Sequence, residues 1–270
     1  MRNTFGWLIA GLVASSMVAG LAGCKPNTPA QKNQEAASSN AQPVRPPAVP
    51  LDPATLGTLT GTVHFAGKAP ERLRIDMSQD PVCSMMGGDN FAEQYVVHNG
   101  KLENVYIYVK SGPAAAMSAP PATTAPVVLD QIGCRYVPHV IALMQGGSVE
   151  FRNSDGTMHN IHTMPTVAAN KEIDVSQGPK GAPQVRQFPQ PEVMMPVRCN
   201  NHPWMNAFIN VSPTPFFAVT DANGHFEIKG LPAGTYTLAA VHEKMGEQDM
   251  TVTVKPHATE AANFTYSMKK

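Results

Sequence analysis

The sequence predicts an all-β fold made of short strands joined by turns. The 270 residues include 25 Pro and 21 Gly, amounts that favour short strands, turns and loops over helices. The Asn223-Gly224 pair is a strong hairpin signal, and apolar Phe226 and Ile228 alternate with polar neighbours just after it. The same alternation in residues 250–254 predicts a last strand.

Composition also excludes two classes of protein. The 20 basic residues are balanced by 20 acidic ones, and only 7% of the residues are aromatic, so neither charge nor base stacking favours binding to nucleic acid. The pattern of a multi-span membrane protein is missing as well. The 9 His and 15 Met, beside only 4 Cys, point to soft or borderline metal ligands.

The N-terminus is predicted to be a secretion signal. Arg2 precedes an uncharged apolar stretch, residues 5–21, which is too short and too early for a membrane span. The following Leu21-Ala22-Gly23-Cys24 resembles the lipobox of bacterial lipoproteins. That resemblance implies cleavage before Cys24 and lipid on its thiol, and Lys25 after it favours the outer membrane, facing the periplasm or the cell surface. An ordinary signal peptide or an uncleaved anchor helix is the alternative.

A proline-rich segment follows. Residues 25–57 contain seven Pro among Ala, Gln, Asn and Ser, with no apolar periodicity. Such a composition cannot bury a core, so residues 24–57 are predicted to be a disordered tether between the membrane and the folded part.

If Cys24 is lipidated, three cysteines remain, and an odd number in an oxidising compartment needs an explanation. The simplest one is that Cys83 and Cys134 form a disulfide and that Cys199 is kept free for chemistry.

The neighbours of Cys199 predict a metal site. Cys199, His202 and Met205 follow one another at the spacing Cys-x2-His-x2-Met, which a tight loop can turn towards one ion. Upstream, residues 153–162 supply a second imidazole at His159. Two His and one Cys with a weak axial Met describe a blue-copper site.

These stretches resemble the ligand loops of the cupredoxins, the small blue-copper electron carriers of the amicyanin and plastocyanin type. Residues 148–153 fit the strand that precedes the upstream ligand, and the short Cys-x2-His-Pro-x-Met loop is most similar to that of amicyanin. The resemblance implies a Greek-key β-sandwich and a single copper ion, with four ligands: His159, Cys199, His202 and Met205.

Three neighbours gain a role from the same resemblance. Asn160 matches the residue whose hydrogen bonds brace one ligand loop against the other. Met195 stands where the binuclear copper centre of terminal oxidases has a second Cys, so a mononuclear site is implied. Trp204 is expected to cover the site and to offer an aromatic docking surface, or simply to pack.

The sequence leaves open whether other His and Met side chains take part in the metal site. His162 lies three residues after His159, so in an extended strand the two face opposite ways, and a surface role is favoured. His139 and His242 are expected to be strand residues with local partners, although both could approach the ligand loops. Four methionines could form a thioether rim or simply fill the core, and these are Met158, Met164, Met194 and Met195.

The region after the copper loop resembles the transthyretin-like regulatory domain of carboxypeptidases over about fifty residues. Residues 59–65 and 101–109 look like further strands of the same sandwich. One sandwich with an inserted cupredoxin is therefore expected, and two domains in series are the alternative. The expected segments are a signal peptide (1–23), a tether (24–57), the first part of the sandwich (58–127), the cupredoxin (128–213) and the completing strands (214–270).

The expected function is electron transfer. No nucleophile–base pair or paired carboxylates accompany the ligands in the sequence, so an enzyme is not predicted. A membrane-anchored one-electron carrier would exchange electrons with a redox protein such as a c-type cytochrome or a dehydrogenase. A copper storage or delivery lipoprotein and a surface scaffold with a structural metal are the alternatives. The whole arrangement is similar to methylamine-utilisation-like proteins, but similarity of fold does not transfer function.

Overall fold

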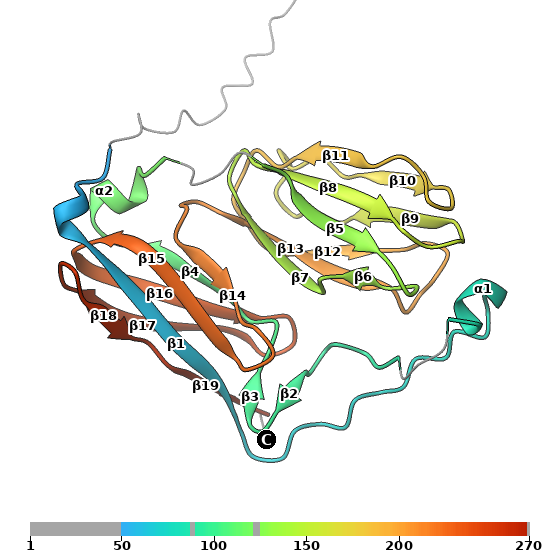
Figure 1. Ribbon diagram of the computed structural model, residues 1–270, viewed down its shortest axis with the longest axis horizontal. Helices are drawn as coiled ribbons and strands as arrows, with labels where there is room; N and C mark the ends of the chain where they lie inside the picture. Colours follow the sequence, from blue (N-terminus) through green and yellow to red (C-terminus); the bar gives the residue numbers. More distant parts are fainter. Residues whose placement is uncertain (1–49, 87–89, 121–124, 269–270) are drawn as a thin grey trace, which may run out of the picture. The chain divides into compact units, whose positions relative to one another are not determined.

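The computed structural model describes residues 50–86, 90–120 and 125–268. Over these residues the regular structure is almost entirely β, with 19 strands (Figure 1). The exceptions are three single-turn helices: η1 (Pro53–Thr55), α1 (Pro81–Ser84) and α2 (Ala114–Met117). The prediction of an all-β fold is confirmed. No helix in the described ranges is long and apolar enough to cross a membrane. The signal peptide, Cys24 and most of the tether lie outside the described residues.

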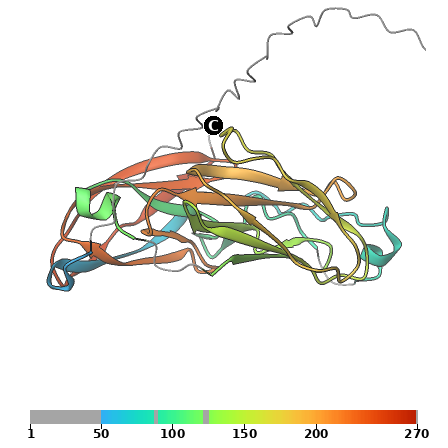
Figure 2. The ribbon, with the colours of Figure 1, turned by 90° about the horizontal axis from the view of Figure 1, so that it is seen from above.

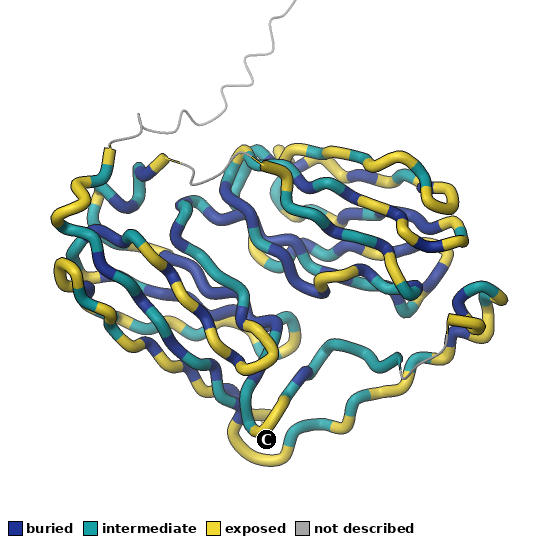
Figure 3. Tube along the Cα trace, viewed as in Figure 1, coloured by how far each residue is buried: buried dark blue, intermediate teal, exposed yellow. Residues whose placement is uncertain are grey.

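The first sandwich, called the host sandwich here, contains strands from both ends of the described chain. One sheet has the order β15 (His225–Pro232), β1 (Leu56–Ala66), β3 (Lys101–Leu102) and β2 (Val97–His98), and β1 also pairs with β18 (Thr259–Ala261) and β19 (Phe264–Ser267). The other sheet has the order β14 (Phe217–Val219), β4 (Tyr106–Ser111), β16 (Gly234–His242) and β17 (Gly246–Val254). Alternating burial along β1 turns Leu59, Val63 and Phe65 into the shared core (Figure 3).

The second sandwich, called the inner sandwich here, is built from residues 127–212. Its larger sheet has the order β10 (Asp174–Gln177), β9 (His159–Thr163), β12 (Glu192–Arg198), β13 (Asn206–Ser212) and β7 (Val140–Met144). Its smaller sheet has the order β11 (Gln184–Gln187), β8 (Ser148–Asn153), β5 (Val127–Gln131) and β6 (Tyr136–Val137). Val149 and Phe151 of β8 pack with Ile161 and Val197 in its own core.

Backbone pairing keeps the two groups of strands separate. In the described part of the chain, the ladders of β5 to β13 join only one another, and those of β1 to β4 and β14 to β19 do the same (Figure 2). The inner sandwich therefore interrupts the host sandwich in sequence, between β4 and β14.

The folded part begins earlier than the composition indicates. The tether was expected to run to residue 57, but Asp52 caps η1 by accepting a hydrogen bond from the Ala54 N–H at 3.0 Å, and β1 starts at Leu56. Leu56 and Gly57 pair with Pro232 and Leu231 of β15, a long-range contact that composition cannot reveal.

A long connection between β1 and β2 carries α1. We call residues 76–86 the cap segment. Asp80 caps α1 by accepting hydrogen bonds from the N–H groups of Val82 (2.8 Å) and Cys83 (3.0 Å), and Pro81 occupies the first helical position. A disulfide joins Cys83 to Cys134 in the turn between β5 and β6, so the cap segment is covalently tied to the inner sandwich.

Gly61 tests the packing of β1. An added Cβ at this position would lie 1.8 Å from the carbonyl oxygen of Ala262 and 2.7 Å from the ring of Phe226. The Ala262 N–H donates to the carbonyl of Thr60 at 2.9 Å, so this backbone cannot retreat without losing pairing. Gly61→Ala is expected to lower the free energy of unfolding by about 3 kcal/mol, measured by urea denaturation. The control, Gly178→Ala, has open space at its Cβ, and an equal effect of both changes would contradict this packing.

Candidate metal centre

All four expected ligands lie on one sheet of the inner sandwich or in the turn between two of its strands, β12 and β13. His159 is the first residue of β9, whereas Cys199 follows β12, which pairs with β9 through Val197–Thr163 and Arg198–His162. The turn after β12 is tight, because the Met205 N–H donates to the carbonyl of His202 at 2.9 Å. Pairing of β9 with β12 thus brings residues about forty positions apart in sequence to one end of the sheet.

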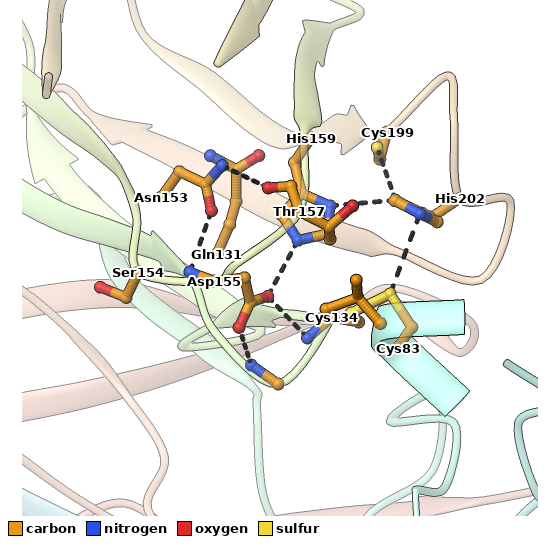
Figure 4. A network of polar contacts seen from close by, with 12 residues as sticks. Cys83, Gln131, Cys134, Asn153, Ser154, Asp155, Thr157, His159, Cys199 and His202 are labelled. Atoms are coloured by element: carbon orange, nitrogen blue, oxygen red, sulfur yellow. Dashed lines mark hydrogen bonds and ion pairs between the residues drawn. A yellow bond between two sulfur atoms is a disulfide. The ribbon is translucent and has the colours of Figure 1, made fainter. Parts of the chain in front are cut away.

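The donor atoms of these residues converge. Nδ1 of His159 lies 2.9 Å from Nδ1 of His202, and Sγ of Cys199 lies 3.5 Å from the same His202 atom (Figure 4). His159, Cys199 and His202 each offer a donor atom within 4.8 Å of the others, and their exposed fractions are 0%, 4% and 3%. Met205 is also buried and packs in the same core cluster as Cys199. Two imidazoles and a thiol form a donor set that suits copper, and the backbone of Met205 is hydrogen-bonded to that of Cys199 and of His202.

The surroundings of Cys199 favour its thiolate. Burial alone would raise the pKa of this thiol, but hydrogen bonds from His159, from the backbone N–H groups of Asn160 and Asn201, and from His202 lower it to about 7. The Asn160 N–H donates to Sγ at 3.3 Å. The sulfur is therefore held close to the charge state that binds a metal.

A buried carboxylate holds His159. Oδ2 of Asp155 lies 2.8 Å from Nε2 of His159 and also accepts a hydrogen bond from the Cys134 N–H at 2.8 Å. Burial favours the neutral acid, but the hydrogen bonds from His159 and from the backbone lower the pKa of Asp155. Burial likewise lowers the pKa of His159, yet its bonds to Asp155 and Cys199 raise it to about 9. A metal that binds Nδ1 must therefore displace a proton from the metal-free site.

The loop before β9 fixes the position of Asp155. The side chain of Asn153 donates to the carbonyls of Thr157 (3.0 Å) and Gly178 (2.8 Å) and accepts from the Asp155 N–H at 3.1 Å (Figure 4). This loop lies within residues 153–162, the stretch that supplies the second imidazole in the predicted site.

His202 meets the cap segment. Its Nε2 lies 3.1 Å from Oδ2 of Asp80 and 3.8 Å from Sγ of Cys83. The half-buried indole of Trp204 lies 5.1 Å from the imidazole, centroid to centroid, and its Nε1–H donates to the carbonyl of Cys134 at 3.1 Å. His202 is thus covered by Trp204 on one side and by the cap segment on another.

Asn160 connects the two ligand segments. Its side-chain oxygen accepts from the Asn200 N–H at 3.3 Å, next to Cys199, and its Nδ2 donates to Asp174 on β10 at 2.9 Å. The first of these hydrogen bonds joins the two ligand segments, where a brace was expected, and the second ties Asn160 to β10.

The remaining histidines have other partners. His162 binds Asn200 and Glu172 at the surface, at 2.9 and 2.8 Å. His139 is buried, and its Nε2 lies 2.7 Å from a carboxylate oxygen of Glu243. His242 is buried beside Tyr95 and Tyr266, and burial lowers its pKa to about 4. None of these three joins the donor cluster within the described residues.

The four methionines that could form a rim or fill the core differ in how far they are buried. Met195 is 1% exposed and fills the inner core, and Met194 packs against the cluster formed by Tyr106, Tyr108, Ala239 and Val241. Met158 and Met164 expose 50% and 38% of their surface.

Sequence reasoning missed the two carboxylates. Asp155 stands four residues before His159, within residues 153–162. An acidic residue so close to a candidate ligand is the signal that could have predicted it as a partner of His159. Asp80 and Pro81 carry the signature of a helix start. This signature predicts α1, but it does not predict the contact of Asp80 with His202.

Comparison with known proteins supports the resemblance to the regulatory domain of carboxypeptidases directly. The family model of the carboxypeptidase regulatory-like domain matches residues 198–267, which confirms the predicted resemblance of the C-terminal strands. No curated protein matches the chain.

The solved structures to which the chain is similar include a copper-containing nitrite reductase and cupredoxins. A copper-containing nitrite reductase from Thermus scotoductus is 24% identical, with 36% of this chain and 26% of that chain covered and a TM-score of 0.29. A purple cupredoxin from Nitrosopumilus maritimus is 20% identical (32% and 99% covered, TM-score 0.27), and an amicyanin variant in its Cu(I) state is 19% identical (40% and 99% covered, TM-score 0.29). The chain thus spans about a quarter of the nitrite reductase.

The ionisation of Cys199 can be tested on the metal-free protein. Because its pKa is lowered to about 7, the ultraviolet absorbance of the thiolate is expected to rise with a midpoint near pH 7. Cys83 and Cys134 do not contribute, since they form a disulfide. The titration should vanish in Cys199→Ser, and a midpoint near the ordinary value of about 8.5 would contradict the assigned hydrogen bonds.

Proposed function

We propose that this protein is a one-electron carrier that holds a single copper ion at His159, Cys199, His202 and Met205. One observation carries the proposal: two imidazole Nδ1 atoms, 2.9 Å apart, share a buried cluster with the Cys199 sulfur. A bound copper ion would supply the redox couple, alternating between Cu(I) and Cu(II).

The protein's own residues would keep the geometry constant through this change. Each imidazole is held through its Nε2 by a carboxylate, and the Cys199 sulfur accepts the Asn160 N–H. The ligands are at most 4% exposed, so water and substrates are kept away from them. A closed, pre-formed ligand set suits electron transfer better than catalysis, which needs a coordination position open to substrate.

The cellular setting is proposed from the sequence. The lipobox-like residues before Cys24 and the proline-rich tether support a lipid-anchored protein exported to the outer membrane. The Cys83–Cys134 disulfide is consistent with an oxidising compartment. A c-type cytochrome or a dehydrogenase in the same compartment would exchange electrons with it.

Copper delivery is the second candidate. Exposed thioethers favour it, because Met85 and Met86 end the cap segment and Met158 precedes His159, with exposed fractions of 77%, 38% and 50%. Thioethers bind Cu(I) and could pass it on.

Met205 is expected to tune the potential. Met205→Leu replaces a thioether by a side chain of similar volume, so the fold should persist. Copper should remain bound while its reduction potential shifts, because an axial thioether tunes this potential. Metal analysis and potentiometry would measure both. Met195→Leu, equally buried in the same core, is the control and should leave the potential unchanged. Complete loss of copper in Met205→Leu would contradict the axial role.

The proposed function itself is tested by Cys199→Ser. The copper-loaded protein is expected to show an intense visible band and a reversible one-electron couple in spectroelectrochemistry. Both should disappear in Cys199→Ser, because the band arises from charge transfer between thiolate and copper. Asn201→Ser, on the same turn, is the control and should keep both. A band that survives in Cys199→Ser would remove this residue from the site.

A chelator of Cu(I) separates the carrier from the delivery protein. An electron carrier retains copper in both oxidation states, so the reduced protein should resist the chelator. Rapid transfer of Cu(I) from the wild-type protein would favour delivery and contradict the carrier.

A further inference from the structure

The second imidazole of the centre is held by a segment that lies outside the inner sandwich. His202 belongs to the turn between β12 and β13, but Asp80 belongs to the connection between β1 and β2 of the host sandwich. Oδ2 of Asp80 lies 3.1 Å from Nε2 of His202. The two residues are 122 positions apart in sequence.

Both carboxylate oxygens of Asp80 are engaged. Oδ1 accepts the N–H groups of Val82 and Cys83, and Oδ2 accepts the hydroxyl of Thr157 at 3.2 Å as well as the imidazole. The Asp80 side chain is only 19% exposed. A carboxylate accepts hydrogen bonds and cannot donate one, so Nε2 of His202 must carry a proton, and Nδ1 is left as the nitrogen that faces His159 and Cys199 and can bind a metal.

The disulfide links this pair to the other carboxylate–imidazole pair. Cys83 donates its backbone N–H to Asp80, which holds His202. Cys134 donates its backbone N–H to Asp155, which holds His159. Figure 4 shows the disulfide below the two imidazoles, on the side of His202 away from Cys199. One covalent bond therefore joins the supports of both imidazoles.

We propose that Asp80 is a positioning residue of the metal centre, and that the Cys83–Cys134 disulfide holds it against His202. The inference rests on the proposed ligand set. It adds a support for one ligand that comes from the host sandwich. The negative charge of Asp80 makes the imidazole a stronger donor and stabilises Cu(II) more than Cu(I). Asp80 therefore lowers the reduction potential, and the tied cap segment slows the loss of copper.

Asp80→Asn separates charge from shape. Asn also caps helices through its single side-chain oxygen, so α1 and the fold should persist. Its NH2 group then stands where the second carboxylate oxygen accepted from His202. Cu(II) affinity is expected to fall by roughly 10- to 100-fold. The potential should rise by about 59 mV for each tenfold by which Cu(II) loses more affinity than Cu(I). Asp76→Asn is the matched control, because Asp76 is exposed on the same segment and accepts a hydrogen bond from Ser78 of that segment, and it should change neither quantity.

The double change Cys83→Ser and Cys134→Ser tests the tie and does not depend on the folding of Asp80→Asn. Removal of the disulfide should speed transfer of copper to a chelator several-fold. It should also raise the reduction potential, as Asp80→Asn does. Release at the wild-type rate, with an unchanged potential, would overturn the role of the disulfide.

The outcomes separate this inference from the proposed function. The wild-type protein could show the visible copper band while Asp80→Asn and Asp76→Asn have equal reduction potentials. This result would overturn the role of Asp80 alone. A wild-type protein that binds no copper would overturn the proposed function, and this inference with it.

Discussion

The structure depends on how a cluster of polar donor atoms is kept inside an apolar core. His159, Cys199 and His202 are almost completely buried, and burying such groups without partners costs several kcal/mol each. The Nε2 atom of each imidazole, which points away from the cluster, has a carboxylate as partner, and the sulfur accepts a backbone N–H. The two Nδ1 atoms and the sulfur are left facing one another, as a metal would require.

This constraint explains why the fold extends beyond one sandwich. The inner sandwich supplies the ligands through the pairing of β9 with β12, and the support of one imidazole through Asp155. The host sandwich supplies the other support through the cap segment, whose disulfide fixes a connection that contains little regular structure (Figure 1). The insertion of one group of strands between the others brings both carboxylates to the same centre.

The sequence predicted what is local and missed what is not. Cys199, His202 and Met205 lie within one turn, and His159 stands behind a recognisable strand, so the ligand cluster could be predicted from spacing and family resemblance. The alternation after Asn223 predicted β15 correctly. Asp80 could not be predicted as a partner of His202, because a contact over 122 positions leaves no local pattern. The early start of β1 was missed for the same reason, since Leu56 and Gly57 pair with strand β15, far along the chain.

The most direct test of this account is the optical and electron-paramagnetic spectrum of the protein loaded with Cu(II), recorded together with its metal content. The account predicts one copper ion per chain, a strong band from thiolate-to-copper charge transfer and a narrow copper hyperfine splitting. A colourless protein that holds zinc, or no metal, would contradict it.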